Sequence, residues 1–527
     1  MTEEWFQNYI GNIGSTPSDM AVDASGNIYI TGVTVGPVPL TGNDYATAMY
    51  NSSGVFQWET FYNGTAGYHD VPSAIAIDPQ GNILVTGASP GTIGGLDSAE
   101  DYLTIKYNSA GNEIWTQRYN GNTLFTNIRT DVPTDMVVDD LGNVYVTGTS
   151  APDGGANQNC LTIKYDGDGN QLWTARNTQA DGGVALKVDD LGNVYVSGRG
   201  SGLTGGLDYI TIKYNSAGQE LWLRRFNDSG MDVNLPKAMD IDDNGNVYVT
   251  GRSEGYLGYL TVKYNSAGDL MWFANYYNVS TNDGAEDIAV DNLGNVFVTG
   301  SSQNSGATTS DYATVKYNSD GAEQWASRYT GLGGTIGMSG ADAIALDSFG
   351  NVYVTGHSEG ANFGGDGYDY ATIKYNTSGI QQWAIRFNST ESDWATSIYV
   401  DSNGKVIVAG ESYLNGNSTI GIIKYSQSPT DVQEISSKVP ENFYLFQNYP
   451  NPFNPSTKIK YTIAQDGFVT LKVFDILGNE IKILFNSYQN SGNYEIVLDG
   501  SELSSGIYYY KLQSGDFVAV KKLVLTK

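Results

Sequence analysis

The sequence contains little of the chemistry that cross-links secreted proteins or equips common hydrolases. Its 527 residues include one cysteine and two histidines. A single cysteine, Cys160, precludes an intramolecular disulfide, so packing and hydrogen bonding must hold the fold together. His69 and His357 lie far apart in the sequence, and no Gly-x-Ser-x-Gly, His-Glu-x-x-His or Cys-x-x-Cys motif occurs. The sequence therefore offers no standard nucleophile or metal motif.

Basic residues are also scarce. The chain has 28 Lys and Arg against 57 Asp and Glu, which gives a formal net charge of −29. Residues 426–527 contain 9 Lys and 10 Asp or Glu, so residues 1–425 carry nearly all of the negative charge. Such a field repels nucleic acid and anionic lipid, and it favours divalent cations, cationic partners or simple solubility. No run of 18 apolar residues occurs, so we expect no transmembrane segment.

What the chain does contain is an internal repeat. The motif Asp-x-x-Gly-Asn-(Val/Ile)-(Tyr/Phe)-Val-(Thr/Ser)-Gly recurs eight times at intervals of 49 to 61 residues, and the last copy is looser, with Lys405 and Ala409 at the Asn and Thr positions. A period near 50 indicates supersecondary units that bury their apolar surfaces only against neighbouring units. The copies begin at Asp23, Asp78, Asp139, Asp189, Asp242, Asp291, Asp347 and Asp401.

Each unit has the pattern of four β-strands. In the second unit these are residues 74–78, 83–87 and 102–107, followed by a stretch that carries Trp115 and Tyr119. Tyr, Val, Ile, Thr and Trp dominate these runs and suit a pleated, half-buried surface, while the Gly-Asn and Asn-Ser-Ala-Gly stretches suit tight hairpin turns. Four antiparallel strands per unit make one propeller blade, so the predicted fold class is all-β.

The two ends of the repeat region complement each other. Seven units close with a tryptophan-bearing strand, but the eighth stops at residues 422–425 without one. Residues 4–9 have the character of the missing strand, so we expect the amino terminus to complete the last blade and to close an eight-bladed β-propeller over residues 1–425. A seven-bladed ring with one unit outside it is the alternative. The tryptophans are Trp58, Trp115, Trp173, Trp222, Trp272, Trp325 and Trp383.

These units resemble the bacterial beta-propeller repeat family known as SBBP, whose repeats carry a GNVYVTG-like strand followed by a DYATIKYN-like strand. The resemblance spans roughly residues 3–425. It implies a propeller fold. Because that family is not tied to one activity, the resemblance implies nothing catalytic.

The composition changes after the repeats. Residues 426–442 are polar, contain two prolines and lack alternation, which predicts a linker. Residues 443–527 contain alternating apolar positions such as Val469, Leu471 and Val473, which predict a small antiparallel, immunoglobulin-like β-sandwich.

This last segment resembles the carboxy-terminal sorting domain of proteins exported by the type IX secretion system of Bacteroidetes. The resemblance rests on the NYPNPFN opening at 448–454, the DILG turn at 475–478 and the SGIYY strand at 505–509. It implies recognition of the folded tail by the secretion machinery, passage across the outer membrane, and often removal of the tail during surface attachment. We therefore expect an extracellular or outer-membrane-surface location. The residues assigned to the sorting motif are Asn448, Pro450, Asn451, Pro452, Phe453, Asn454, Asp475, Gly478 and Gly506.

Proteins of this kind need an inner-membrane export signal. Residues 1–5 have neither a basic region nor an apolar region. We therefore expect the signal peptide to be missing from this chain.

One face of the predicted propeller carries connections of variable length. These are residues 33–43, 88–100, 149–157, 199–207, 252–257, 301–310, 357–368 and 411–418. Variable loops on a rigid scaffold are typical of a binding surface, although neutral drift gives the same pattern.

Five carboxylates recur on this loop face, each eight residues before the Asp that ends its inner strand. Capping or turn stabilisation is the default interpretation, and a cation or sugar site near the propeller axis is the sharper hypothesis. Calcium is the one cofactor that this pattern suggests. The five candidate ligand-binding residues are Asp70, Asp131, Asp181, Asp283 and Asp393.

Taken together, these patterns favour a secreted or surface-anchored propeller without catalytic activity, which binds an extracellular protein or a glycan through its loop face or serves as a structural module. A carbohydrate-active enzyme, either a glycoside hydrolase or a lyase using loop-face carboxylates, is the alternative, because such an enzyme needs only two or three acidic residues. A cation-stabilised adhesive or envelope protein is a third possibility. No nucleic-acid partner is expected.

Overall fold

The computed structural model contains strands and no helix among the residues that it describes. A helix able to cross a membrane is therefore not found in that part of the chain. The chain divides into two compact units, residues 5–424 and residues 1–4 with 425–527. The described residues are 1–527 except 10–14, 36–41, 65–68, 94–95, 122–130, 152–157, 203–204, 228–232, 254–257, 278–282, 305–308, 332–337, 360–366, 390, 403, 427–432, 437–439, 441, 466, 490, 501–502 and 516.

The described part of the repeat region forms eight four-stranded sheets. The first sheet contains β2 (Thr16–Val22), β3 (Ile28–Val35), β4 (Asn43–Tyr50) and β5 (Phe56–Tyr62), paired in sequence order. Their pairings are antiparallel, as expected for short hairpin connections. The predicted all-β fold with four strands per repeat is confirmed.

The next six sheets repeat this order. They consist of β6 (Val71–Ile77), β7 (Ile83–Ile93), β8 (Leu96–Tyr107), β9 (Glu113–Tyr119); β10 (Val132–Val138), β11 (Val144–Ser150), β12 (Asn159–Tyr165), β13 (Gln171–Asn177); β14 (Gly182–Val188), β15 (Val194–Ser201), β16 (Leu207–Tyr214), β17 (Glu220–Phe226); β18 (Asn234–Ile241), β19 (Val247–Ser253), β20 (Gly258–Tyr264), β21 (Leu270–Tyr276); β22 (Gly284–Val290), β23 (Val296–Gln303), β24 (Ser310–Tyr317), β25 (Glu323–Tyr329); and β26 (Gly340–Leu346), β27 (Val352–Glu359), β28 (Tyr368–Tyr375), β29 (Gln381–Phe387).

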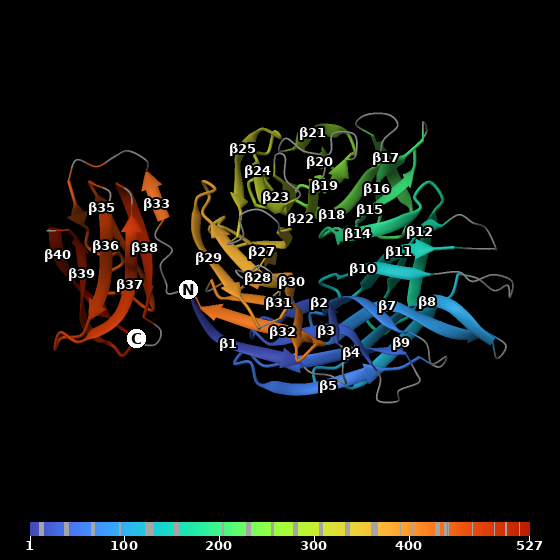
Figure 1. Ribbon diagram of the computed structural model, residues 1–527, viewed down its shortest axis with the longest axis horizontal. Helices are drawn as coiled ribbons and strands as arrows, with labels where there is room; N and C mark the ends of the chain where they lie inside the picture. The colour runs from blue at the N-terminus through green and yellow to red at the C-terminus, as the bar shows by residue number, and fades with distance from the viewer. Residues whose placement is uncertain are drawn as a thin grey trace. The chain divides into compact units, whose positions relative to one another are not determined.

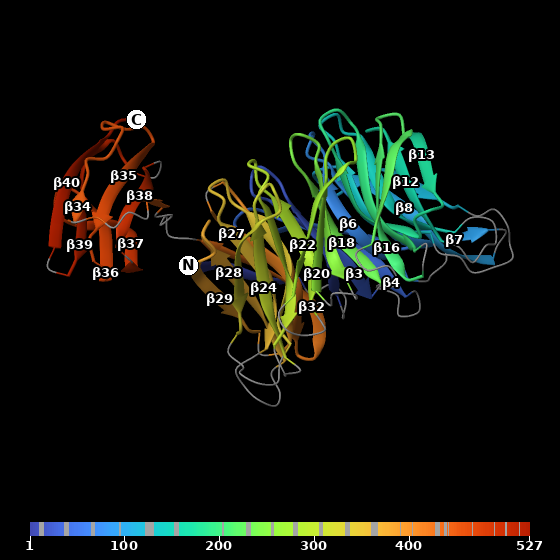
Figure 2. The ribbon, with the colours of Figure 1, turned by 90° about the horizontal axis from the view of Figure 1, so that it is seen from above.

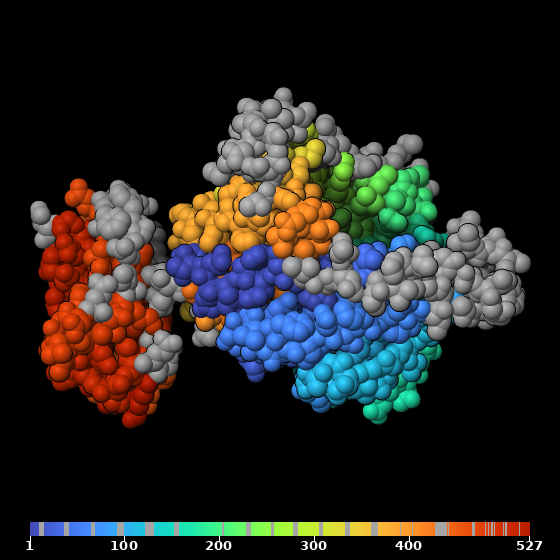
Figure 3. All heavy atoms as spheres, turned by 60° about the horizontal axis from the view of Figure 1, so that its bottom comes forward, coloured from blue at the N-terminus to red at the C-terminus, as the bar shows by residue number. Residues whose placement is uncertain are grey.

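The remaining sheet combines the first strand of the chain with the last three strands of the repeat region. Its strand order is β1-β32-β31-β30, with β30 (Asp393–Val400), β31 (Val406–Leu414), β32 (Asn417–Ser426) and β1 (Thr2–Tyr9). The amino-terminal strand therefore lies beside β32, the position that the missing tryptophan strand of the eighth repeat predicted. Figure 3 shows this blue amino-terminal segment running along the surface next to the orange strands of the last repeat.

Figure 1 shows the sheets arranged about a common centre, with the labelled first strands β2, β10, β14, β18, β22 and β30 on the inner side. First strands of consecutive sheets contact each other, and β30 of the last sheet contacts β2 of the first. In Figure 2 the strands run side by side across the thickness of this unit. Each hydrophobic cluster combines residues of two neighbouring sheets; one, for example, joins Tyr195 and Trp222 to Met239, Val247 and Leu260.

The repeated Asp-x-x-Gly-Asn motif is the hairpin turn between the first two strands of each sheet. At Asp139, Oδ1 accepts the backbone N–H groups of Leu141 and Asn143, and Oδ2 accepts the Asn143 side-chain amide and the Tyr145 hydroxyl. Gly142 has a φ of 81°, a conformation that glycine adopts without steric cost. The motif therefore recurs because one carboxylate accepts most of the hydrogen bonds that the donors of the turn offer.

Neighbouring sheets are held together by a contact between tryptophan and glycine. Trp115 of the second sheet packs on Gly169 of the third, where an added Cβ would lie 2.8 Å from the indole Cδ2 atom. Its Nε1–H donates to the carbonyl of Gly167 at 3.1 Å, and Lys106 Nζ donates to the same oxygen at 2.8 Å. Lys106 also pairs with Asp78 at 2.8 Å. The recurrent tryptophans, lysines and hairpin glycines thus belong to one contact between sheets.

Among the described residues, the packing of a tryptophan on a hairpin glycine recurs at seven junctions. The tryptophan and glycine pairs are Trp5 with Gly54, Trp58 with Gly111, Trp115 with Gly169, Trp173 with Gly218, Trp222 with Gly268, Trp272 with Gly321, and Trp325 with Gly379. The first pair joins the amino-terminal strand to the first sheet, so Trp5 packs on a hairpin glycine as the other tryptophans do, but its buried Nε1–H has no hydrogen-bond partner in the described part of the chain.

The C-terminal unit contains two four-stranded sheets that share one hydrophobic core. Their orders are β33-β38-β35-β34 and β37-β36-β39-β40. The strands are β33 (Gln433–Ser436), β34 (Tyr444–Leu445), β35 (Ser456–Ile463), β36 (Gly467–Phe474), β37 (Glu480–Gln489), β38 (Gly492–Asp499), β39 (Gly506–Ser514) and β40 (Phe517–Leu525).

One detail differs from the predicted linker at 426–442. Residues 433–436 form β33, which pairs with β38 at the edge of a sheet. An edge strand is held through its backbone groups, so a polar segment without alternation can still pair. Residues 427–432, 437–439 and 441 of this predicted linker lie outside the described residues.

The contact between Trp5 and Gly54 gives a stability test. Gly54 and Gly81 both have φ near +78°, but a Cβ at Gly54 would lie 2.5 Å from Trp5 Cδ2, whereas a Cβ at Gly81 would meet nothing within 4 Å. We expect Gly81→Ala to lower the unfolding free energy by about 1 kcal/mol through backbone strain alone. Gly54→Ala should cost about 1 to 3 kcal/mol more, because the indole must move. Thermal and denaturant unfolding of the two variants measures this difference; equal losses would contradict the contact.

Candidate functional site

The five recurrent aspartates lie immediately before or at the start of their first strands, where they hold the preceding loops. Asp131 is 3% exposed, and its Oδ2 accepts the backbone N–H of Gly121 at 2.7 Å. Its Oδ1 accepts the hydroxyl of Ser150 and the backbone N–H of Ala151. One carboxylate therefore connects the loop from the previous sheet to the end of the second strand of its own sheet.

The other four aspartates bind donors in equivalent places. Asp70, Asp283 and Asp393 are at most 1% exposed, and Asp181 is partly buried. Their donors include the Gly64 N–H for Asp70, Ser201 Oγ–H for Asp181, Gln303 N–H for Asp283, and the Ser389 N–H, Ser389 Oγ–H and Ser412 Oγ–H groups for Asp393.

The remaining three sheets carry other polar residues at this position, and the sequence reasoning missed them. Ser15, Asn234 and Ser339 are all buried. Ser15 donates to Thr34, and Ser339 donates to Ser358. The sequence signal that could have found these three residues is their position eight residues before the repeat aspartate. A search restricted to carboxylates does not detect them.

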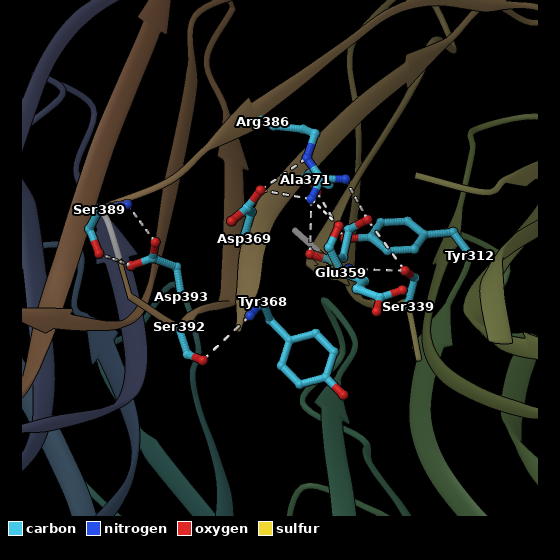
Figure 4. Close-up of polar contacts among 11 residues, drawn as sticks. Tyr312, Ser339, Glu359, Tyr368, Asp369, Ala371, Arg386, Ser389, Ser392 and Asp393 are labelled. Carbon is cyan, nitrogen blue, oxygen red and sulfur yellow. Dashed lines mark hydrogen bonds and ion pairs between the residues drawn. The ribbon is translucent and has the colours of Figure 1, made fainter. Parts of the chain in front are cut away.

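A second network at the same end of the sheets is built around arginine, and the sequence analysis did not identify it. Arg386 contacts Asp369 Oδ2 through Nη2 at 2.7 Å and through Nε at 3.1 Å. Its Nη1 donates to Ser358 Oγ at 2.8 Å, and its Nη2 also donates to the Ser358 and Glu359 carbonyls. Figure 4 shows the guanidinium enclosed by these oxygens, with Asp393 and Ser389 forming a separate group beside it.

Three other sheets repeat this ion pair. In each of the four, the arginine follows the tryptophan of the fourth strand by three residues, which is the sequence signal that could have found it. The pairs are Arg118 with Asp101 at 3.2 Å, Arg225 with Asp208 at 2.9 Å, Arg328 with Asp311 at 3.2 Å, and Arg386 with Asp369 at 2.7 Å.

A third set of carboxylates joins neighbouring first strands. Asp19 Oδ2 accepts the N–H of Ile75, Asp135 Oδ2 that of Leu186, and Asp287 Oδ2 that of Ile344, each in the next sheet. Burial is the main cause that raises the pKa of Asp19 to about 7 and the pKa of Asp287 to about 6. These carboxylates link the first strands of neighbouring sheets, because each accepts backbone hydrogen bonds.

The residues that most often act as nucleophiles or bases are used structurally. Cys160 is fully buried, and burial raises the pKa of its thiol to about 11, which disfavours the reactive thiolate. His357 contacts Asp342 at 3.0 Å and packs at a tilt against Trp394 with a ring-centroid distance of 3.9 Å. His69 Nδ1 accepts the backbone N–H of Asn43.

Within the described ranges, no group of three or more His, Cys, Asp or Glu side chains could hold a metal ion. The five aspartates of the predicted cation site are therefore not assembled into such a cluster. The central parts of seven of the eight variable loops, including 36–41, 152–157 and 360–366, lie outside the described residues. The hairpin between β31 and β32 is the loop described in full.

The sorting-motif residues of the C-terminal unit fall into two groups, one in the connection at 448–454 and one in turns and at a strand end. Those of 448–454 connect β34 to β35 and attach this connection to the last strand. The Phe453 side chain is 1% exposed in the core, and its N–H and C=O bond to Val524 and Thr526. Asn451 accepts from the Val524 N–H and donates to the Lys522 carbonyl. Asn448 is 2% exposed and donates to the Pro450 carbonyl.

The other motif residues form turns and strand ends. Peptide bonds preceding Pro450, Pro452 and Pro455 are cis, the last following Asn454. Asp475 accepts the N–H groups of Leu477 and Asn479, and Gly478 has a φ of 85°. Gly506 begins β39.

Comparison with protein families identifies both units. The profile described as Beta-propeller repeat (SBBP) matches residues 4–37, 62–94, 114–151 and 341–364. The profile described as Secretion system C-terminal sorting domain matches residues 447–526. The chain therefore contains beta-propeller repeats and ends in a secretion-system sorting domain, as its sequence predicted. These two features point to a secreted propeller protein.

Comparison with individual proteins is less informative. No curated protein matches the chain. Similar solved structures include a eukaryotic initiation factor (8% identity, 92% of this chain and 91% of that chain, TM-score 0.42) and the polysaccharide lyase Uly1 (10%, 80% and 91%, TM-score 0.39). An alpha-L-arabinofuranosidase from Fusarium graminearum also matches (9%, 55% and 90%, TM-score 0.36). At these values the matches carry no information on activity.

The Arg386 network predicts a large effect of a single substitution. Arg386→Met leaves the Asp369 carboxylate, which is 5% exposed, without its counter-charge. We expect the unfolding free energy to fall by about 3 kcal/mol, because an uncompensated charge remains buried. Arg199 is exposed, and Arg199→Met should change stability by less than about 0.5 kcal/mol. Denaturant unfolding monitored by tryptophan fluorescence compares the two, and similar values would contradict a structural role of the network.

The raised pKa of Asp19 predicts a specific pH dependence. Between about pH 4 and pH 7 the folded chain holds a proton on Asp19 that the unfolded chain releases, so stability falls as pH rises through this window and levels off above it. One proton gives a slope of at most about 1.4 kcal/mol per pH unit. Asp19→Asn should remove this component from the melting profile between pH 4 and pH 8, whereas Asp140→Asn, at an exposed position, should retain it. A profile of Asp19→Asn that matches wild type would count against the assignment.

Proposed function

We propose that the protein is an exported, non-catalytic binding module in which an eight-bladed propeller presents variable loops to an extracellular protein or glycan. The blade count is supported by the eight sheets, by the pairing of β1 with β32 and by the contact between β30 and β2. In this proposal residues 1–425 form the propeller, residues 426–442 hold the linker and β33, and residues 443–527 form the sorting domain, which has an immunoglobulin-like sandwich architecture.

The observation that supports the binding proposal is that acidic side chains at the loop face are engaged in structural hydrogen bonds and ion pairs. Asp131 and Asp393 each accept three or more hydrogen bonds from their own loops and strands. Asp101 and Asp369 are neutralised by arginines. Carboxylates that hold loops in place are poorly suited to serve as a catalytic pair, but they make the base of each variable loop rigid, which suits recognition.

Export is assigned to the C-terminal unit. The sorting profile and the type IX resemblance support recognition of this unit by the type IX secretion machinery and delivery to the cell surface or the medium. No further partner is assigned to it.

The proposal is tested with the purified full-length chain on panels of glycans, polysaccharides and extracellular matrix proteins. We expect retention of at least one ligand class without chemical change, because the scaffold offers a binding face and its described residues assemble no catalytic pair. Release of new reducing ends would indicate hydrolysis, and new unsaturated ends would indicate a lyase. Either product would overturn the non-catalytic assignment and favour the carbohydrate-active alternative.

A further inference from the structure

The first sheet contains a buried carboxylate that lacks a counter-charge. Asp44, the second residue of β4, is 0% exposed, and neither of its two carboxylate oxygens has a hydrogen-bond partner. Burying an ionised carboxylate without a partner is among the most unfavourable arrangements in a protein interior. Stable proteins therefore supply such a group with a cation or with donors.

The other sheets show what normally occupies this place. Asp101, Asp208, Asp311 and Asp369 stand at the position of Asp44, and each is paired with the arginine that follows it by 17 residues. In the first sheet the residue at that spacing is Phe61. The three sheets without an aspartate carry Asn159, Gly258 and Thr419 instead. Asp44 is thus the one acidic residue of this set whose own sheet supplies no arginine.

A second carboxylate lies next to Asp44. The backbone N–H of Asp70 donates to the carbonyl of Asn43 at 2.7 Å, which brings Asp70 to the start of β4. Asp70 is 1% exposed; its Oδ2 accepts the Gly64 N–H, and the Ser89 hydroxyl also hydrogen-bonds to this carboxylate. Burial and the nearby charge of Asp70 raise the pKa of Asp44 to about 6.

The arginine whose charge acts on Asp70 is engaged elsewhere. Arg118 binds Asp101, the Ser89 hydroxyl and carbonyl, and the Tyr62 hydroxyl. It therefore contributes only a long-range charge to Asp70. Both buried carboxylate oxygens of Asp44 therefore remain without donors among the described residues, beside the second carboxylate of Asp70.

We propose that Asp44 and Asp70 bind one calcium ion, which takes the place that an arginine guanidinium holds in four other sheets. Two carboxylates match the charge of a divalent cation, and calcium accepts irregular sets of oxygen ligands that include water and backbone carbonyls. With two carboxylates this site is smaller than the groups of three or more acidic or other metal-binding residues discussed above, and it does not depend on the proposed ligand-binding function.

The test uses the full-length chain, freed of metal with a chelator, and CaCl2 as the probe. We expect isothermal titration to give one site per chain, and CaCl2 to raise the melting temperature reversibly. Asp44→Asn should weaken calcium binding by about tenfold or more, because it removes one of two charged ligands. Asp369→Asn alters an equivalent aspartate that already has its arginine, so it should leave calcium binding unchanged.

A second variant keeps the inference testable if Asp44→Asn fails to fold. Phe61→Arg introduces the side chain that the other sheets use, so it should abolish the calcium response and match the stability of calcium-loaded wild type in the presence of chelator. Absence of heat and of a melting shift in wild type would overturn the proposal. So would a calcium response that survives both Asp44→Asn and Phe61→Arg.

Discussion

The contact between a tryptophan of one sheet and a hairpin glycine of the next is the interaction on which the repeat region depends. A four-stranded sheet has two apolar faces and cannot bury them alone. The indole ring lies where a Cβ would otherwise be, and its N–H binds a carbonyl of the same hairpin, as Trp115 does with Gly167. This single contact fixes both the spacing and the register of adjacent sheets, so its repetition specifies the whole arrangement.

A second constraint acts at the loop end of the sheets, where charge must be buried. The chain is strongly acidic, yet its buried aspartates are compensated one by one by arginines, hydroxyls and backbone N–H groups. These local networks stabilise the scaffold through residues at the bases of the loops. The remaining loop residues can therefore vary in sequence without loss of the scaffold. The first sheet departs from the pattern at Phe61, and this departure leaves Asp44 without compensation.

The C-terminal unit shows how a sorting signal can consist of ordinary structural chemistry. The Asp-x-Leu-Gly-Asn turn at Asp475 shares three hydrogen bonds with the turn at Asp139 in the repeats and lacks the tyrosine hydroxyl. The distinctive part is the 448–454 segment, whose Phe453 and Asn451 attach the first connection of the unit to its last strand. Much of the motif therefore preserves the folded shape of the tail, and Tyr449, at 81% exposure, is the exposed aromatic side chain of this segment.

The sequence by itself determined the repeat, its four strands and the C-terminal unit. Turn formation and the alternation of apolar residues depend on residues close together in the sequence, so both can be recognised without a structure. It also indicated that residues 4–9 would supply the missing strand, since Trp5 stands where a repeat tryptophan was absent. It did not disclose β33, whose pairing rests on backbone groups, or the arginine networks, whose members lie 17 residues apart and on different strands. Only the tertiary structure decided which carboxylates are compensated and which are not, because charge balance depends on distances between strands that folding alone sets.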